Sequence, residues 1–167
     1  RPITISGVEF GGSLLPIIAG PNTVENKEMI LKTAYEVKKA GAHILRGGAF
    51  KPLTFPYRSQ KYFELRDEGL RYLEEAKNET GLPIITEVME VDKVTAVSEV
   101  ADILQIGTRN MQNFPLITAA AKTMKPLMIK RHFGCSLRDW LGAAEYALIE
   151  NNSQGILCER GVTAPHT

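Results

Sequence analysis

Leu45-Arg46-Gly47-Gly48-Ala49-Phe50-Lys51-Pro52 is the stretch from which the fold of this chain can be read. The apolar run from Ala42 to Leu45 predicts a buried strand, and the two glycines after it predict a turn in the backbone. Arg46 can grip a carboxylate or a phosphate with two parallel hydrogen bonds, and Lys51 adds a mobile point charge. The stretch therefore predicts either an anion site at the carboxyl end of a strand or an ordinary turn with two solvated cations.

The same order, an apolar strand followed by a helix, recurs along the chain. Strands are expected at residues 14–19, 42–45, 84–88, 103–106, 127–129 and 155–158. Helices are expected from Asn22 or Thr23 to Gly41 and at residues 63–78, 91–100, 114–124 and 137–150. Strands that alternate with helices of this length predict βαβ units and a parallel sheet with right-handed crossovers. Residues 1–13, with a turn at Gly11-Gly12, are expected to form an N-terminal hairpin or extension.

Polar side chains follow each expected strand, and their number decides between the two α/β architectures. In a TIM (β/α)8 barrel all carboxyl ends of the strands meet on one face, whereas an open doubly wound sheet has only one crevice, at its switch point. The sequence also lacks Gly-x-Gly-x-x-Gly after the first strand. We therefore predict a (β/α)8 barrel, with about six of its eight units visible and residues 14–167 forming an incomplete catalytic barrel. The polar residues are Asn22, Arg46, Lys51, Glu87, Gln105, Arg109, Lys130, Arg131, Glu159 and Arg160.

The overall charge indicates where a basic site can come from. With 20 basic and 19 acidic residues the net charge is +1, so no global field favours nucleic acid or a membrane surface. No apolar run reaches the ~18 residues needed to span a bilayer. The excess of cations at the strand ends is therefore local, and it predicts an anionic, phosphorylated substrate.

The histidines and cysteines add little to this site. His132 is either a general acid or base or, more simply, a polar loop residue, and His43 is expected to be packed within a strand, while His166 has no informative context. Cys135 and Cys158 have no metal-ligand spacing, and they predict free thiols in a reducing compartment, the cytoplasm.

Six motifs in register resemble 3-deoxy-D-arabino-heptulosonate 7-phosphate (DAHP) synthase of the type Iβ group. The resemblance runs in order from Leu14 to Gly161. It implies a TIM barrel that condenses phosphoenolpyruvate with erythrose 4-phosphate, the first step of the shikimate pathway of aromatic amino acid biosynthesis. The motifs are Ile-Ala-Gly-Pro at 18–21, Leu-Arg-Gly-Gly-Ala-Phe-Lys-Pro at 45–52, Thr-Glu-Val at 86–88, the stretch 105–114, Ile-Lys-Arg at 129–131 and Leu-Cys-Glu-Arg-Gly at 157–161.

The resemblance also implies roles for individual residues. Lys51 and Glu87 would be catalytic, with Lys51 managing the proton between the two substrates and Glu87 lining the same pocket. Gly107 and Thr108 would supply backbone contacts to the phosphate of phosphoenolpyruvate. The cations that would bind phosphoenolpyruvate are Arg46, Lys51, Arg109, Lys130 and Arg160.

Two departures from the family pattern bear on the metal and on the second substrate. The family implies a divalent metal (Mn, Fe, Co or Zn), but Asn22 stands where a cysteine ligand is usual, and an amide is a poor substitute for a thiolate. Leu53 stands where an arginine that grips the aldose phosphate is expected. The expected partners are phosphoenolpyruvate and a phosphorylated aldose, without nucleic acid or membrane, in a homo-oligomer.

Two other interpretations stay open. In having an asparagine at position 22, the chain also resembles the metal-independent members of the 3-deoxy-D-manno-octulosonate 8-phosphate synthase family, which use arabinose 5-phosphate. Alternatively, the chain is a non-catalytic paralogue or fragment that binds a phosphorylated ligand.

Overall fold

The computed structural model describes residues 2–51 and 64–161 of the 167-residue chain. It divides into two compact units, the first made of Arg1–Glu87 with Glu99–Asp102 and the second of Val88–Ser98 with Ile103–Thr167. Two residues discussed above, Leu53 and His166, lie outside the described ranges. No helix within the described ranges is long and apolar enough to cross a membrane.

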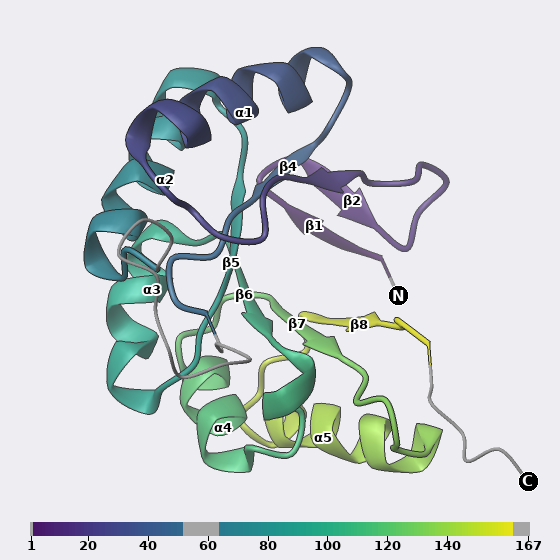
Figure 1. Cartoon of the computed structure of the whole chain (residues 1–167). Coiled ribbons are helices and arrows are strands. Elements are labelled where there is room, and N and C mark those ends of the chain that lie inside the picture. The colour runs from purple at the N-terminus through teal and green to yellow at the C-terminus, as the bar shows by residue number, and fades with distance from the viewer. Residues whose placement is uncertain (1, 52–63, 162–167) are drawn as a thin grey trace, which may run out of the picture. The chain divides into compact units, whose positions relative to one another are not determined.

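The chain begins with the predicted hairpin, whose turn differs from the prediction. Strands β1 (Ile3–Ile5) and β2 (Val8–Phe10) pair antiparallel, with Ile5 opposite Val8 (Figure 1). The turn is therefore Ser6-Gly7, and both residues have positive φ, at 48° and 82°. Gly11-Gly12 follows the hairpin instead of forming its turn, because the ladder register leaves only Ser6 and Gly7 between the paired residues.

Three parallel strands form the sheet of the first unit. They are β3 (Ile18–Ala19), β4 (Ile44–Arg46) and β5 (Ile84–Glu87), with Ala19 opposite Leu45 and Leu45 opposite Ile84. The prediction of a buried strand from residue 14 is wrong at its start, because Leu14 and Leu15 are 75% and 82% exposed. Hydrogen bonding to the next strand begins only at Ile17, whose carbonyl accepts the N–H groups of His43 and Ile44.

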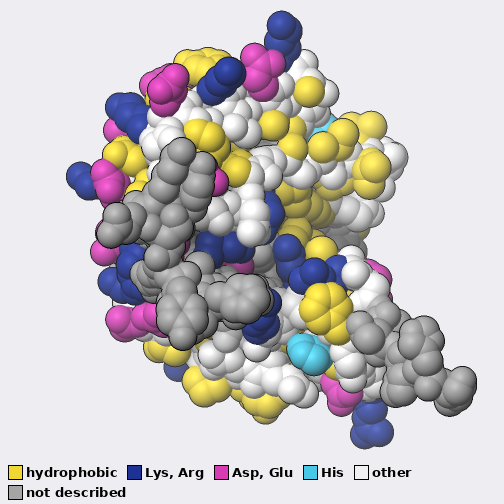
Figure 2. Space-filling model, viewed as in Figure 1, with side chains coloured by type: hydrophobic (Ala, Val, Ile, Leu, Met, Phe, Trp, Pro, Cys, Tyr) yellow, Lys and Arg dark blue, Asp and Glu magenta, His cyan; other side chains and the backbone are white. Residues whose placement is uncertain are grey.

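Helices α1 (Lys27–Lys39) and α2 (Asp67–Thr80) pack against each other in this unit. The first starts at Asn26, one turn later than predicted, because the Asn26 side chain accepts the N–H of Met29 at 2.8 Å. The second ends at Thr80, two residues later than predicted, and is capped by Gly81, which has φ 73°. Their inward faces bury Ile30 and Leu73 completely, and Figure 2 shows Lys, Arg, Asp and Glu side chains interspersed over their outer surface.

The second unit repeats the same arrangement. Strands β6 (Ile103–Ile106), β7 (Leu127–Lys130) and β8 (Gly155–Cys158) are parallel, with Gln105 opposite Met128 and Met128 opposite Ile156. Helices α4 (Phe114–Lys122) and α5 (Leu137–Ile149) pack together on one side of these strands (Figure 1). Helix α3 (Val94–Val100) follows a single 3₁₀ turn at Val91–Lys93.

In each unit the strands pair in chain order, without the reversal that marks a doubly wound sheet at its switch point. Parallel neighbours place their carboxyl ends at one edge. The loops that follow β3, β4 and β5 therefore meet at one edge of the first unit, and those that follow β6, β7 and β8 meet at one edge of the second.

Candidate active site

In the first unit, the loop after β3 is bound directly to the loop after β4. Arg46 ends β4, and its Nη2 donates to Oδ1 of Asn22 at 3.0 Å. The backbone N–H of Val24 donates to the carbonyl of Gly48 at 2.9 Å. Gly20 permits this approach, because it has φ 147° and a Cβ there would lie 1.9 Å from the carbonyl oxygen of Arg46. These contacts hold the Arg46 guanidinium beside the Asn22 amide.

The two glycines of the opening stretch serve a different purpose from the predicted one. Neither Gly47 nor Gly48 has positive φ, so conformational freedom is not what they supply. A Cβ on Gly48 would lie 2.4 Å from the carbonyl oxygen of Asn22 and 2.4 Å from Cδ of Lys51. A Cβ on Gly47 would lie 2.7 Å from Cδ2 of Leu73. The glycines are needed because the neighbouring chain segments leave no room for a side chain.

Lys51 and Glu87 form an ion pair that is nearly shielded from water. Nζ of Lys51 lies 3.2 Å from Oε2 of Glu87, and the side chains are 10% and 6% exposed. Glu87 is the last residue of β5, so the strand fixes the carboxylate and the carboxylate fixes the ammonium. A held ammonium can bind an anion or donate a proton, which are the two functions expected of Lys51.

A second group of contacts surrounds Arg160 in the second unit. Nη1 of Arg160 donates to Oγ1 of Thr108 at 2.7 Å, and its Cζ lies 4.4 Å from the centre of the Phe133 ring. Thr108 is buried and opens the 3₁₀ turn Thr108–Asn110, directly after the buried Gly107. The loops after β6, β7 and β8 thus meet at one guanidinium.

Two more of the predicted phosphate-binding cations lie in this unit. Lys130 is the last residue of β7 and is half-buried. Arg109 is exposed and lies within the 3₁₀ turn Thr108–Asn110 after β6. Arg109 therefore follows a parallel strand of the second unit, as predicted, whereas Lys130 is still part of one, because β7 extends one residue beyond its predicted end.

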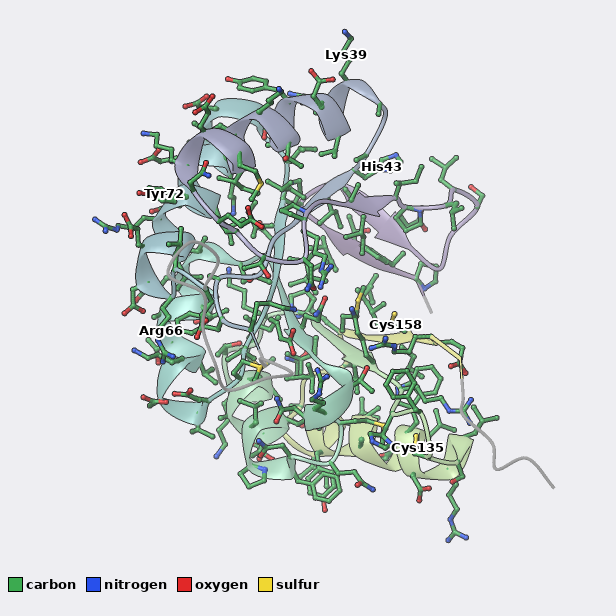
Figure 3. All side chains as sticks on the ribbon, viewed as in Figure 1. Lys39, His43, Arg66, Tyr72, Cys135 and Cys158 are labelled. Carbon is green, nitrogen blue, oxygen red and sulfur yellow. The ribbon has the colours of Figure 1, made fainter. Side chains whose placement is uncertain are left out.

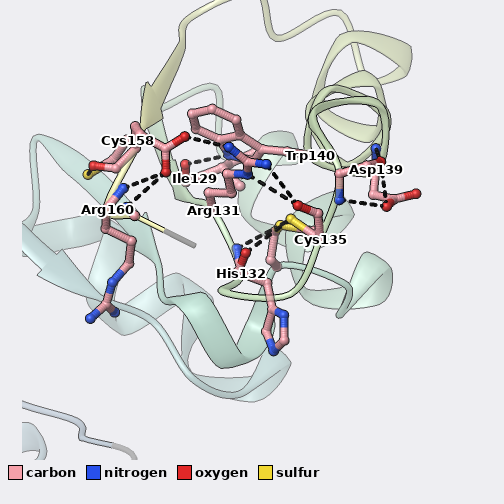
Figure 4. A network of polar contacts seen from close by, with 12 residues as sticks. Ile129, Arg131, His132, Cys135, Asp139, Trp140, Cys158 and Arg160 are labelled. Atoms are coloured by element: carbon pink, nitrogen blue, oxygen red, sulfur yellow. Dashed lines mark hydrogen bonds and ion pairs between the residues drawn. The ribbon is translucent and has the colours of Figure 1, made fainter. Parts of the chain in front are cut away.

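Arg131, which was counted among the site cations, is held within the protein instead (Figure 4). Its Nη1 lies 2.6 Å from Oε2 of Glu159, its Nη2 donates to the carbonyl of Cys135 at 2.9 Å, and its Cζ lies 6.0 Å from the centre of the Trp140 ring. The Glu159 carboxylate thus pairs with the Arg131 side chain, and it also accepts the backbone N–H of Arg160 at 2.8 Å. The Arg131 guanidinium, helped by the N–H of Arg160, holds the pKa of Glu159 below its usual value, and Glu159 raises the pKa of Arg131.

The two histidines within the described residues, His43 and His132, are exposed. His132 is exposed, and its Nδ1 accepts the N–H of Gly134 at 3.1 Å, which fits the interpretation as a polar loop residue. His43 is exposed just before β4, not packed within a strand as predicted, and its Nδ1 accepts the N–H of Ile17 at 3.0 Å.

Both cysteines are free thiols, as predicted (Figure 3). Sγ of Cys135 lies 3.4 Å from Sδ of the buried Met111. Cys158 is the last residue of β8.

The described residues do not fit a metal centre. No three His, Cys, Asp or Glu side chains within residues 2–51 and 64–161 are grouped so that they could hold a metal ion. Oδ1 of Asn22 accepts a hydrogen bond from the Arg46 guanidinium. A cation therefore already faces the amide oxygen that would have to serve as the ligand.

Sequence reasoning missed two contributions to the Arg160 cluster. The side chain of Thr108 accepts a hydrogen bond from Arg160, whereas only its backbone was expected to take part. Phe133 is not among the residues predicted for the site. The available signal was its position in the loop directly after β7, because the polar residues of the predicted site lie at the end of a strand or in the loop that follows it.

Comparison with known proteins gives consistent matches. The profile of the DAHP synthetase I family matches residues 2–166. A phospho-2-dehydro-3-deoxyheptonate aldolase of Thermotoga maritima is 42% identical over 160 residues, which are 96% of this chain and 46% of that protein. A 2-dehydro-3-deoxyphosphooctonate aldolase of Magnetococcus marinus is 34% identical over 166 residues, which are 96% of this chain and 58% of that protein.

The fold agrees with these matches. The crystal structure of a Thermotoga maritima phospho-2-dehydro-3-deoxyheptonate aldolase (DAHP synthase) superposes with a TM-score of 0.91 at 38% identity, covering all of this chain and 47% of that one. A truncated form of 3-deoxy-D-arabino-heptulosonate 7-phosphate synthase from the same organism gives a TM-score of 0.88, again over all of this chain and over 59% of that one. The predicted fold class, part of a TIM (β/α)8 barrel, is confirmed. The chain spans 46% to 59% of the length of these relatives.

Proposed function

The chain belongs to the DAHP synthetase I family, and on that premise we propose that the protein condenses phosphoenolpyruvate with erythrose 4-phosphate to give DAHP. The observation that carries the proposal is the Lys51–Glu87 pair. Lys51 belongs to the Leu-Arg-Gly-Gly-Ala-Phe-Lys-Pro motif, and Glu87, the last residue of β5, holds its ammonium in a position shielded from water. Both substrates of this reaction are phosphorylated, and cations at strand ends suit them.

We assign the binding of phosphoenolpyruvate to the cations that match the family motifs. These cations are Arg46, Lys51, Arg109, Lys130 and Arg160. Gly107 and Thr108 would face the phosphate with their backbone N–H groups. The carbon–carbon bond forms when C3 of phosphoenolpyruvate attacks the aldehyde carbon, whose C=O π bond breaks as its oxygen takes up a proton. Water then adds at C2, and inorganic phosphate leaves. Fixed cations favour these steps because they hold two anions in contact and need no reorganisation.

Within this assignment Lys51 and Glu87 have the catalytic roles. The carboxylate of Glu87 holds the ammonium at 3.2 Å, so Lys51 is placed to donate a proton or to neutralise developing charge. The family is generally metal-dependent, but the described residues include no group of three His, Cys, Asp or Glu side chains that could hold a metal ion.

A second candidate is the synthesis of 3-deoxy-D-manno-octulosonate 8-phosphate from phosphoenolpyruvate and arabinose 5-phosphate. Two observations favour it: the 34% identity with the Magnetococcus marinus aldolase, and an asparagine at position 22 that hydrogen-bonds Arg46. The Leu-Arg-Gly-Gly and Gly-Thr-Arg-Asn motifs favour DAHP synthesis instead.

The two candidates are separated by one assay on the full-length protein. Phosphoenolpyruvate is supplied with erythrose 4-phosphate or with arabinose 5-phosphate, with and without added Mn²⁺, and released inorganic phosphate and the sugar acid are measured. Turnover with erythrose 4-phosphate alone supports the proposal, and turnover with arabinose 5-phosphate alone selects the second candidate. Binding of phosphoenolpyruvate without turnover of either sugar would identify a non-catalytic paralogue.

Two substitutions test the residue assignments. Lys51→Met is expected to lower kcat by about a hundredfold or more, the usual contribution of a positioned proton donor. Lys39→Met, which removes an exposed lysine in the last turn of α1, is the matched control and should leave kcat unchanged. Equal effects of the two substitutions would contradict the role of Lys51.

A further inference from the structure

The Arg160 guanidinium lies over the face of the Phe133 ring. We propose that Phe133 is a positioning residue, which holds this guanidinium in the orientation that binds the phosphate or carboxylate of the substrate. The identity of that substrate rests on the proposed function, but the contact itself does not. Phe133 lies in the loop after β7 and Arg160 in the loop after β8, so the ring joins two neighbouring loops of the second unit.

Two contacts of different kinds hold the guanidinium. Cζ of Arg160 lies 4.4 Å from the ring centre of Phe133, well within the ~6 Å range of a cation–π contact. Nη1 donates to Oγ1 of Thr108 at 2.7 Å. The Thr108 hydroxyl occupies one of the five N–H donors of the guanidinium, whereas a phenyl ring carries no oxygen or nitrogen acceptor. The contact with Phe133 therefore orients the guanidinium without occupying a donor that an anion needs.

The backbone beneath Arg160 is fixed by a separate network (Figure 4). Oε1 of Glu159 accepts the N–H groups of Arg160 and Gly161 at 2.8 and 3.0 Å, and its Oε2 lies 2.6 Å from Arg131. In Figure 4 the Arg160 side chain extends away from this network, while its N–H stays within it. The network thus determines where the side chain starts, and Phe133 with Thr108 determines where it ends.

Phe133 itself is held by the loop around it. The N–H of Cys135 donates to the carbonyl of His132 at 3.3 Å, and Arg131 binds the carbonyl of Cys135. Phe133 is 40% exposed, and isolated exposed aromatic side chains are common on protein surfaces, so exposure alone does not single it out. Phe133 differs from such side chains because a guanidinium lies over its ring and because the backbone of its loop is hydrogen-bonded on both sides of it.

The energy of such a contact sets the size of the expected effect. A partly exposed cation–π pair corresponds to roughly a two- to fivefold change in binding. Loss of the ring should therefore weaken the binding of phosphoenolpyruvate and raise its KM two- to fivefold, with a smaller change in kcat. A loop that was merely destabilised would lower the melting temperature and the active fraction instead.

The test uses the full-length protein with Phe133→Leu, Phe133→Tyr and Phe133→Trp, with Tyr35→Leu as a control for loss of an exposed aromatic side chain in the other unit. Calorimetry measures the binding of phosphoenolpyruvate and, separately, of inorganic phosphate. NMR of ¹⁵N-labelled protein follows Nε–Hε of Arg160, which the ring current should shift upfield. In Phe133→Leu we expect the upfield shift to be lost and the affinity to fall two- to fivefold, and in the two aromatic variants we expect both to be kept.

Each other outcome has a definite meaning. Three results would overturn the positioning role. Phe133→Leu could bind as tightly as the unsubstituted protein, the upfield shift could be absent from the unsubstituted protein, or the aromatic variants could bind as weakly as Phe133→Leu. Phosphate binding that depends on Phe133, without binding of phosphoenolpyruvate, would refute the proposed function and uphold this inference. Binding of neither anion would refute both.

Discussion

The ammonium of Lys51 lies 3.2 Å from Oε2 of Glu87, with the two side chains only 10% and 6% exposed. Removing one partner of such a buried ion pair destabilises the protein, because the remaining charge would be buried without an opposite charge beside it. Lys51 is thus bound to the core of the first unit, although it follows two glycines in a loop.

Replacing the carboxylate of this pair should destabilise the protein. In Glu87→Gln the amide keeps a hydrogen-bond acceptor but leaves the Lys51 charge uncompensated, and we expect a loss of about 3 kcal/mol in the free energy of unfolding. Urea denaturation checks the value. The double variant Glu87→Gln with Lys51→Met should recover part of the loss, and no recovery would contradict the pairing.

Gly20 is expected to tolerate no side chain. A Cβ there would lie 1.9 Å from the carbonyl oxygen of Arg46, at φ 147°, so Gly20→Ala should cost about 3 kcal/mol of stability. Gly142→Ala is the matched control, because Gly142 lies inside α5 with open space around it, and alanine should stabilise that helix by about 0.5–1 kcal/mol. Thermal denaturation of the two variants should therefore shift in opposite directions.

A carboxylate in place of the Asn22 amide should separate stability from binding. In Asn22→Asp the oxygen beside Arg46 becomes charged, so the hydrogen bond gains strength while the guanidinium becomes less available to an anionic substrate. We expect stability equal to or above that of the unsubstituted protein and about tenfold weaker binding of phosphoenolpyruvate, equivalent to about 1.4 kcal/mol.

Asn26→Asp provides the control for the change in charge. Asn26 caps α1 through the same kind of side-chain oxygen, and aspartate is an equally good cap. This variant should bind phosphoenolpyruvate with unchanged affinity in calorimetry. Equal weakening by both substitutions would show that net charge, and not the contact with Arg46, is responsible.

The ion pair between Arg131 and Glu159 predicts a dependence of stability on pH. The pKa of Glu159 is lower in the folded protein than its ordinary value of 4.5, chiefly because Arg131 hydrogen-bonds the ionised form. The contribution of the pair is therefore fully present above about pH 4.5 and is lost as the pH falls through the folded-state pKa. Urea denaturation should show Glu159→Gln less stable than the unsubstituted protein at pH 7, with the difference shrinking as the pH falls below 4.5. A difference independent of pH would argue against this linkage.

The order of strands and helices followed from hydrophobic patterning, and the strands at 103–106 and 155–158 have the predicted bounds. The errors lie where local patterning does not specify a partner. The apolar run at 14–19 pairs only from Ile17, and α1 begins where the Asn26 side chain finds an N–H group to accept. Leu14 and Leu15 carry the same local signal as Ile18, but they have no strand beside them among the described residues.

The sequence by itself determined the fold class, the family and the residue types at the ends of the strands, because these depend on periodicity and on motifs that can be read along the chain. Only the tertiary structure decided which charges are paired. It pairs Arg131 with Glu159 and Lys51 with Glu87, and it hydrogen-bonds Arg160 to Thr108. It also shows that Gly47 and Gly48 are needed because neighbouring atoms leave no space for a side chain, and not because they form a turn. The physical reason is that ion pairing, stacking and steric exclusion act over a few ångströms between residues up to 52 positions apart. No spacing along the chain encodes such contacts.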